Sequence, residues 1–183
     1  MTRSPAQRRP APARARGEAA PDEGYAGLAR VQRVAAAVVD PEIPVLTLED
    51  LGVLRGVERR KGRIVVQITP TYTGCPATHA IRLAVEAALA EAGFADAVVE
   101  TVLSPPWSTD QITDEGRRKL QAYGIAPPPR GARARTLFGS ETVACPRCGA
   151  TETTRISEFG STPCKALWRC GRCAEPFDYF KCL

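Results

Sequence analysis

The sequence predicts a mixed α/β (α+β) protein, in which a small α-β-β-α-β-α domain is followed by a β-rich zinc-ribbon module. Helix-like and strand-like hydrophobic patterns alternate over most of the chain. Paired cysteines recur near the C-terminus, and a Pro- and Arg-rich stretch precedes them. A chain of 183 residues has room for one ordinary domain and a small module, because domains usually run to roughly 100–150 residues.

The first domain is expected over residues 25–125. Apolar residues recur at helical steps from Tyr25 to Val39, and the prolines of the segment Asp40–Pro44 then end this helix. Two β-rich runs, 53–58 and 63–69, flank a Lys61-Gly62 turn and predict a hairpin.

A second helix is expected to begin at Pro76 and to end at Gly93. A third strand is expected over 97–103, and a short helix over 113–123 that ends at Gly124. We expect the buried side of the second helix to consist of Ile81, Leu83, Ala84, Val85, Ala88 and Leu89.

Three further segments complete the predicted organisation. Residues 1–24 form an Arg/Pro/Ala-rich tail that we expect to be disordered, because such a composition buries too little apolar surface. Residues 126–140 form an extended Pro/Arg linker. Residues 141–183 form the ribbon, with β-prone runs at 153–159, 166–169 and 176–181.

Most of the positive charge lies in the tail. The formal net charge is +5, and five arginines against one glutamate give residues 1–20 a net +4, which leaves +1 for residues 21–183. A dedicated nucleic-acid binder carries a basic patch on its folded part. We therefore do not expect nucleic acid as a partner of the folded part.

The sequence also bears on location and on the role of its cysteines. No run approaches the roughly 18 apolar residues that span a bilayer, and the N-terminal segment lacks the apolar region of a secretion signal. We expect no membrane partner and a cytoplasmic location. Because the cytosol keeps thiols reduced, the seven cysteines then indicate metal binding or thiol chemistry rather than disulfides.

Four of the cysteines have the spacing of a zinc ribbon. The motifs Cys145-Pro-Arg-Cys148 and Cys170-Gly-Arg-Cys173 are separated by 21 residues, and each aims two sulfurs at one ion from a single tight turn. Two facing turns complete the tetrahedral shell that zinc prefers. We expect a structural zinc ion here, with an iron site as the alternative, because a unit of about 40 residues has too small a core to fold without one.

Cys164 and Cys182 lie outside this pattern. One interpretation makes them small buried apolar residues, which is how free cysteines often behave. The other makes them a second, transient metal or thiol site, since the strands predicted beside them can place them side by side.

Cys75 directly precedes Pro76 at an expected helix start. Unpaired amides and the helix dipole favour the thiolate at such a position, and a thiolate binds metals or attacks electrophiles. Cys75 is therefore a candidate reactive or metal-transfer residue. The alternative is an ordinary loop thiol. His79 follows one turn later, and we expect a surface or capping role for it. Asp40 and Glu42 form a candidate acidic motif, in which Asp40 is expected to cap a turn.

Several motifs resemble known families. Asp40-Pro-Glu-Ile-Pro44, Leu51-Gly52 and Pro70-Thr-Tyr-Thr-Gly-Cys-Pro76 resemble the iron-sulfur-assembly family that includes SufT and the eukaryotic MIP-type factors. Together with the ribbon, the segments 157–165 and 176–182 resemble the D subunit family of bacterial phenylacetyl-CoA epoxidase systems.

This resemblance implies an accessory protein of phenylacetate catabolism. Its partners would be the oxygenase and reductase subunits of the epoxidase complex, and its role would lie in metal or Fe-S maturation, with transient iron or a cluster as the cargo. The family's reactive cysteine corresponds to Cys75, and its acidic motif corresponds to Asp40 and Glu42. With one histidine and no Glu-x-x-His pair, the chain itself cannot form a di-iron carboxylate centre, so we expect a non-catalytic component.

Two other functional classes compete with this interpretation. A zinc-ribbon nucleic-acid-binding or transcription-associated module is disfavoured by the near-neutral charge of residues 21–183. A thiol-dependent enzyme using Cys75 is disfavoured because the sequence offers no general base paired with that thiol.

Overall fold

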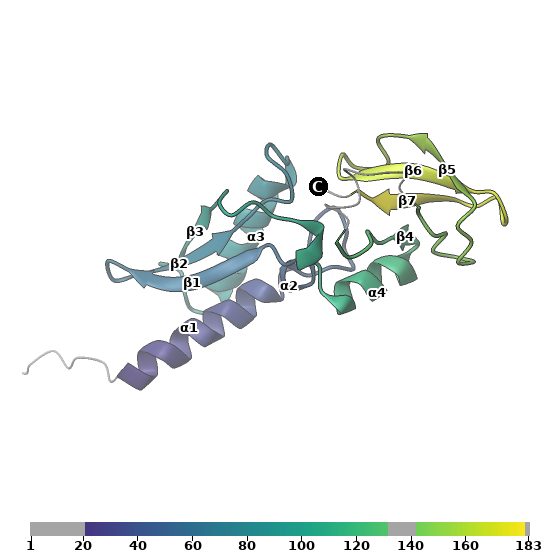
Figure 1. Cartoon of the computed structure of the whole chain (residues 1–183). Helices are drawn as coiled ribbons and strands as arrows, with labels where there is room; N and C mark the ends of the chain where they lie inside the picture. The colour runs from purple at the N-terminus through teal and green to yellow at the C-terminus, as the bar shows by residue number, and fades with distance from the viewer. Residues whose placement is uncertain (1–20, 132–141, 182–183) are drawn as a thin grey trace, which may run out of the picture.

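The computed structural model describes residues 21–131 and 142–181 and divides them between two β-sheets (Figure 1). The expected tail therefore lies largely outside the described residues, as does most of the expected linker. The first sheet has the order β1-β2-β3 and consists of β1 (Leu54–Arg60), β2 (Arg63–Ile68) and β3 (Val98–Thr101).

The pairing within this sheet follows from its connections. β1 and β2 run antiparallel across the Lys61-Gly62 turn, as the hairpin pattern predicts. β3 runs parallel to β2, and a parallel pair needs a crossover long enough to return the chain to the same edge. α3 (Ala77–Glu91) provides that crossover. The hairpin and the third strand predicted from the sequence are therefore confirmed.

Two helices pack against this sheet and against each other. α1 (Pro21–Ala36) begins at Pro21 rather than at Tyr25, so the helix extends into the segment expected to be part of the tail. α1 contacts β1 and α3, and α3 contacts β3 (Figure 1). The fully buried side chains Val31, Leu89 and Val85 of these helices meet Val66 of the sheet in one apolar core.

The buried face of α3 is narrower than predicted. Ile81, Val85 and Leu89 are buried, but Leu83 is 49% exposed and Ala84 is exposed as well. Residues at i, i+4 and i+8 share one helical face, whereas positions 83 and 84 rotate away from it. The expectation that Leu83 and Ala84 lie on the buried side is therefore wrong.

Short elements between the predicted ones connect the two sheets. α2 (Leu48–Leu51) and the 3₁₀ turn η1 (Thr109–Gln111) are too short for a periodic signal and were not expected. α4 (Asp114–Tyr123) begins one residue after the expected start, because Thr113 is its N-cap, and it ends at Gly124 as predicted.

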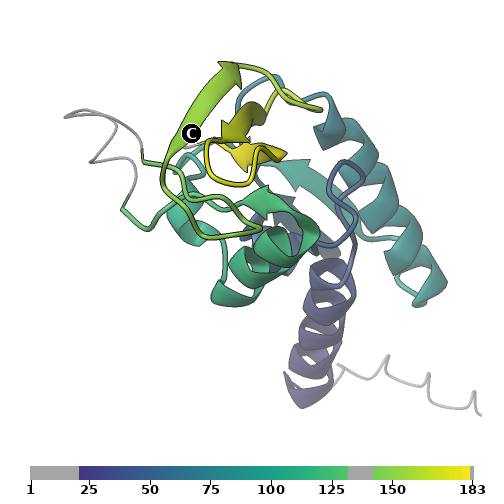
Figure 2. The same ribbon diagram turned by 90° about the vertical axis from the view of Figure 1, so that its right-hand side faces the viewer.

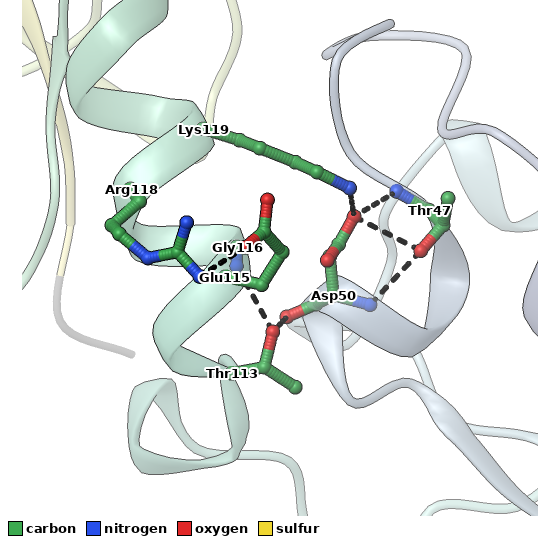
Figure 3. Close-up of polar contacts among 7 residues, drawn as sticks. All are labelled: Thr47, Asp50, Thr113, Glu115, Gly116, Arg118 and Lys119. Carbon is green, nitrogen blue, oxygen red and sulfur yellow. Dashed lines mark hydrogen bonds and ion pairs between the residues drawn. The ribbon is translucent and has the colours of Figure 1, made fainter.

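Asp50 links α2 to α4 (Figure 3). One carboxylate oxygen of the buried Asp50 accepts hydrogen bonds from the backbone nitrogen and hydroxyl of Thr47 at 2.9 and 3.0 Å, and the Lys119 ammonium lies 2.6 Å from it. The backbone carbonyl of Asp50 accepts from the backbone nitrogen of Thr113 at 2.9 Å. One residue thus closes the capping box of α2 and holds the start of α4.

The second sheet contains the ribbon and one strand that precedes it in the chain. Its order is β4-β7-β6-β5, and β4 pairs with β7 in parallel. The expected boundary placed residues 125 and 126 in the first domain and the linker, whereas both lie in the ribbon sheet. The strands are β4 (Ile125–Ala126), β5 (Thr153–Ser157), β6 (Lys165–Cys170) and β7 (Pro176–Phe180).

The two units share apolar contacts. Phe180, at the end of β7, is 1% exposed and packs in the core of the N-terminal unit, where its ring centroid lies 6.1 Å from that of Trp107. The Trp107 indole nitrogen donates to the carbonyl of Leu51 at 2.9 Å. In both ribbon views α4 lies below the ribbon strands, and α1 extends away from them (Figures 1 and 2). None of the described helices is long and apolar enough to cross a membrane.

Replacement of Gly116 by alanine should destabilise the protein. A Cβ atom at this position in α4 would lie 2.7 Å from the carbonyl oxygen of Asp50, closer than real Cβ atoms approach such an atom. The cost of this overpacking, about 1–3 kcal/mol, should exceed the roughly 1 kcal/mol gained from helix propensity. Gly27→Ala in α1 is the matched control, because it meets no atom within 4 Å and should be neutral or stabilising in a urea titration.

The Asp50 network should make stability depend on acid pH. Burial alone would raise the pKa of Asp50, but hydrogen bonds from Lys119 and Thr47 outweigh it and lower the pKa. The stabilisation is therefore fully present above the ordinary carboxyl pKa of about 4 and is lost as the pH falls through the lower folded value. In Lys119→Met, the free energy of unfolding should fall by about 1–2 kcal/mol at pH 7 and should depend less on pH below about 4. An unchanged pH profile in this variant would contradict the assignment.

Candidate functional site

The four ribbon cysteines come together as the spacing predicts. Their sulfur atoms all lie within 4.8 Å of one another, and among the residues that the structure describes this is the one group of three or more His, Cys, Asp or Glu ligand atoms so closely placed. Two sulfur–sulfur distances are 3.8 Å for Cys145 to Cys173 and 3.6 Å for Cys148 to Cys170. These distances are far too long for disulfide bonds of about 2.05 Å.

The donor set fits a tetrahedral metal ion. Two metal–sulfur bonds of about 2.3 Å at a tetrahedral angle place their sulfurs about 3.8 Å apart, close to the observed spacing. Cys145 and Cys170 are buried, whereas Cys173 is exposed. The group therefore has the arrangement of a closed metal site near the surface of the ribbon.

The backbone of the two Cys-x-x-Cys turns is closely matched. The amides of Cys145 and Cys170 donate to the carbonyls of Ala150 and Glu175, five residues further on in each case, at 2.9 Å. The residue after each second cysteine has a positive φ, 73° at Gly149 and 60° at Ala174. The second turn thus adopts the left-handed conformation without a glycine at that position, which costs some strain.

A second candidate site, the thiol pocket, lies where the ribbon meets the N-terminal unit. It encloses about 410 Å³ of empty space, part of which is open to solvent. Its candidate functional side chains are Asp40, Glu42, Cys75 and Cys164. The apolar or uncharged part of the lining is Ile43, Leu51, Val53, Thr69, Pro70, Thr71, Ala77, Thr78, Ile81 and Phe180.

The acidic loop enters the pocket through a turn that Asp40 organises. Oδ1 of Asp40 accepts from the backbone nitrogens of Glu42 and Ile43, both at 2.8 Å. The Asp40 amide donates to the carbonyl of Leu46 at 2.9 Å and closes the loop between α1 and α2. Burial raises the pKa of Asp40 above its usual value, although both amides act in the opposite direction. Asp40 therefore caps a turn, as expected, and orients Glu42.

A tight turn sets the position of Cys75. The Cys75 amide donates to the carbonyl of Tyr72 at 3.3 Å, and Gly74 has a φ of 87°. A left-handed third residue is the requirement of a type II turn, which explains the glycine in the Gly74-Cys75-Pro76 motif. α3 then begins at Ala77 with Pro76 as its N-cap. Cys75 is half-buried at the start of this helix, where the sequence predicts it.

Sequence reasoning missed Tyr72. Burial, together with the charge and the hydrogen bond of the adjacent Cys75, raises the pKa of Tyr72 to about 12. The phenol is protonated at neutral pH and can donate a hydrogen bond to the sulfur of Cys75. Its place three residues before Cys75, across the turn closed at Gly74, is the sequence signal that would have indicated this contact.

Cys164 reaches the thiol pocket from the ribbon. It is 5% exposed, and its sulfur lies 3.0 Å from the Thr162 hydroxyl and 3.9 Å from a carboxylate oxygen of Glu42. Burial raises the pKa of the Cys164 thiol, and the neighbouring Glu42 acts in the same direction. Cys164 is thus both a buried residue and a neighbour of the acidic loop.

The remaining candidates divide into two cases. His79 is exposed and lines a shallow groove beside Cys75 together with Arg82, in line with the expected surface position. Cys182 lies outside the described residues, so the interpretation that it forms a second site with Cys164 stays a hypothesis.

Comparisons with known proteins agree with the two-part organisation. Residues 28–102 match the family described as "Iron-sulfur cluster assembly protein", and residues 129–181 match the "PaaD zinc beta ribbon domain". An Escherichia coli (strain K12) protein, named as the putative D subunit of 1,2-phenylacetyl-CoA epoxidase, is 49% identical over 146 residues, which cover 80% of this chain and 87% of the relative.

Two solved structures are similar to part of the chain. A domain of unknown function from Bacillus anthracis is 25% identical, with a TM-score of 0.48 over 52% of this chain and 92% of that domain. A Mycobacterium tuberculosis protein, described as associated with Fe-S complex assembly and repair, is 33% identical, with a TM-score of 0.32 over 62% of this chain and 98% of its own.

Truncation of Phe180 should open the thiol pocket. Phe180→Ala removes a ring that is 1% exposed and should cost about 3–5 kcal/mol of stability. It should also increase the rate at which an alkylating reagent modifies Cys75, measured by peptide mass spectrometry under conditions where the variant stays folded. Phe159→Ala is the matched control on the same ribbon, because Phe159 is 63% exposed and its ring lies under the Lys181 ammonium, 4.5 Å from the ring centroid. Equal stability and equal alkylation in both variants would show that Phe180 does not close the pocket.

Proposed function

The chain belongs to the family of the phenylacetyl-CoA epoxidase D subunits, and we propose that it is a non-catalytic accessory component of such an epoxidase system. In this proposal it assists metal or Fe-S maturation of the oxygenase or reductase subunits, which are its partners, in the cytoplasm. The observation that carries the proposal is the thiol pocket, in which Cys75 lies beside two carboxylates and a second thiol at the edge of an iron-sulfur-assembly domain.

The surroundings of Cys75 support transfer rather than catalysis. The residues lining the pocket offer carboxylates and thiols, which are metal ligands. The imidazole of His79 lines the shallow groove beside Cys75 and is not part of the pocket lining, where a base for the thiol would have to lie. A half-buried thiol with a phenol donor can hold an ion and release it to a partner. The thiol-dependent enzyme is therefore the less favoured function.

We further propose that Cys145, Cys148, Cys170 and Cys173 bind a structural zinc ion. Their sulfur spacing supports a closed tetrahedral site, and the ribbon has a small core of its own, built around Trp168, Phe177 and Tyr179. When bound, zinc would cross-link the two Cys-x-x-Cys turns and supply folding free energy rather than chemistry.

The zinc proposal predicts about one zinc per chain in the purified protein. Cys148→Ser should lose the metal and unfold the ribbon, because structural zinc contributes on the order of 10 kcal/mol to folding. Elemental analysis and two-dimensional NMR of the ribbon resonances are the measurements. Cys75→Ser is the control and should retain the zinc. A Cys148→Ser protein with full zinc occupancy and a folded ribbon would refute the ligand assignment.

The transfer proposal predicts a specific defect in Cys75→Ser. In cells, the oxygenase complex isolated with this variant should contain several-fold less iron and show correspondingly lower activity, because the delivering thiol is missing. Chemical reconstitution with iron should restore the activity. The melting curve and zinc content of the variant should match wild type, since one half-buried sulfur is changed to oxygen.

A packing role for Cys75 predicts the reverse pattern, with a lower melting temperature and normal iron in the complex. Thr78→Ser, which changes a neighbouring residue of the pocket wall without removing a thiol, is the matched control. Equal iron content with wild type and Cys75→Ser would exclude a transfer role for this residue.

A further inference from the structure

We propose that the thiol pocket binds one thiophilic divalent metal ion through Cys75, Cys164 and Glu42, so that the ribbon supplies a ligand to the site of the N-terminal unit. This proposal rests on the proposed function, from which it takes the assumption that the protein carries metal. It adds a set of ligands that come from both units. It differs from the ribbon site, whose four ligands all come from the ribbon itself.

The fold brings these ligands together from three distant segments. Glu42 and Cys164 are separated by 122 positions in the chain, yet the thiol and a carboxylate oxygen lie 3.9 Å apart. Cys75 lies two residues before the start of α3 and lines the same pocket. Packing of Phe180 and the bond from the Lys181 amide to the Cys164 carbonyl, 3.0 Å long, fix the ribbon segment that carries Cys164.

The charges of the pocket lining favour a cation. It includes the carboxyl groups of Asp40 and Glu42 and two thiols, and none of its lining residues is lysine, arginine or histidine. The nearby Lys165 ammonium lies 3.7 Å from Asp178, a carboxylate of the ribbon. A divalent ion would offset the negative charge that collects when the thiols ionise. Each thiol that becomes a ligand releases one proton to solvent, and no oxidation is involved.

Asp40 takes a supporting rather than a ligating role. Its Oδ1 already accepts from two backbone amides and thereby fixes the loop that carries Glu42. Such a group orients the ligand beside it, as partners of metal ligands commonly do. Two thiolates and one carboxylate are left as ligands, a set suited to Fe²⁺, Co²⁺ or Zn²⁺ rather than to Mg²⁺ or Ca²⁺.

The site is open where the ribbon site is closed. Within residues 27–131 and 142–181, the ligand atoms of the pocket do not converge within 4.8 Å of one another as those of the ribbon cysteines do. Binding therefore requires a side-chain rotation of Cys75 or Glu42 and leaves a coordination position for a partner's ligand. Weaker and faster-exchanging binding than at the ribbon is the expected result.

The test is an anaerobic titration of the zinc-loaded full chain with Co²⁺, followed by thiolate-to-cobalt charge-transfer absorption. A chromophoric chelator in parallel samples reports any zinc released from the ribbon. Wild type should bind one Co²⁺ without releasing zinc. Cys75→Ser and Cys164→Ser should each weaken this binding at least about tenfold, and Glu42→Gln should weaken it to a similar or smaller extent. Glu49→Gln is the matched carboxylate control, because Glu49 is exposed on α2 outside the pocket.

Zinc content and a melting curve are measured for each variant, so that a misfolded Cys164→Ser protein is recognised. If Cys164→Ser does not fold, cobalt binding by the folded Glu42→Gln variant tests the proposal. The proposal is overturned if wild type binds no cobalt outside the ribbon site. It is also overturned if Cys164→Ser and Glu42→Gln bind cobalt as tightly as wild type. The two proposals fail separately. If wild type binds cobalt as expected but cells with Cys75→Ser contain normal oxygenase iron, delivery alone is refuted. If cells with Cys75→Ser show the iron defect but wild type binds no cobalt in the pocket, the pocket site alone is refuted.

Discussion

Packing of the ribbon against the N-terminal unit is the contact on which the rest of the structure depends. Phe180 and Cys164 belong to the ribbon but lie in the apolar core of the N-terminal unit, where Trp107 covers the Phe180 ring. Full burial of one such phenylalanine contributes about 1.5–3 kcal/mol. Strand β4 adds backbone pairing, because it leaves α4 and enters the ribbon sheet beside β7. The two units are therefore joined by core packing as well as by the chain.

This packing connects the two candidate sites. The ribbon places Cys164 and Phe180 only if its strands are folded, and its strands depend on a metal ion at the four clustered cysteines if the zinc proposal is correct. On that proposal, one wall of the thiol pocket is formed by a unit whose folding depends on a metal ion. A chain that lacks the ribbon metal would lose one side of the pocket, although the turn at Gly74 that positions Cys75 would remain.

The sequence predicts the local features well because short segments determine them. Local residues determine the two Cys-x-x-Cys turns, the Lys61-Gly62 hairpin and the end of α4 at Gly124. The thiol pocket is different. Asp40, Glu42 and Cys75 stand out as motifs, but nothing in their spacing places Cys164 beside them, because that contact arises from packing over 122 positions. The same reason explains β4, two residues whose strand pairing is decided by β7.

Two kinds of sulfur site in one small chain suggest a division of labour. A site with four thiolates from one unit, two of them in buried cysteines, binds its ion tightly and is poorly suited to release it. A site whose ligands come from separate segments, with a carboxylate among them and a half-buried cysteine at its edge, exchanges more readily because a partner can displace one ligand at a time. On the proposals made above, delivery would use the second kind of site, and the first kind would keep the second one folded. In this protein a stable metal site would therefore act on function indirectly, through Phe180 and Cys164, by holding a weaker site ready for a partner protein.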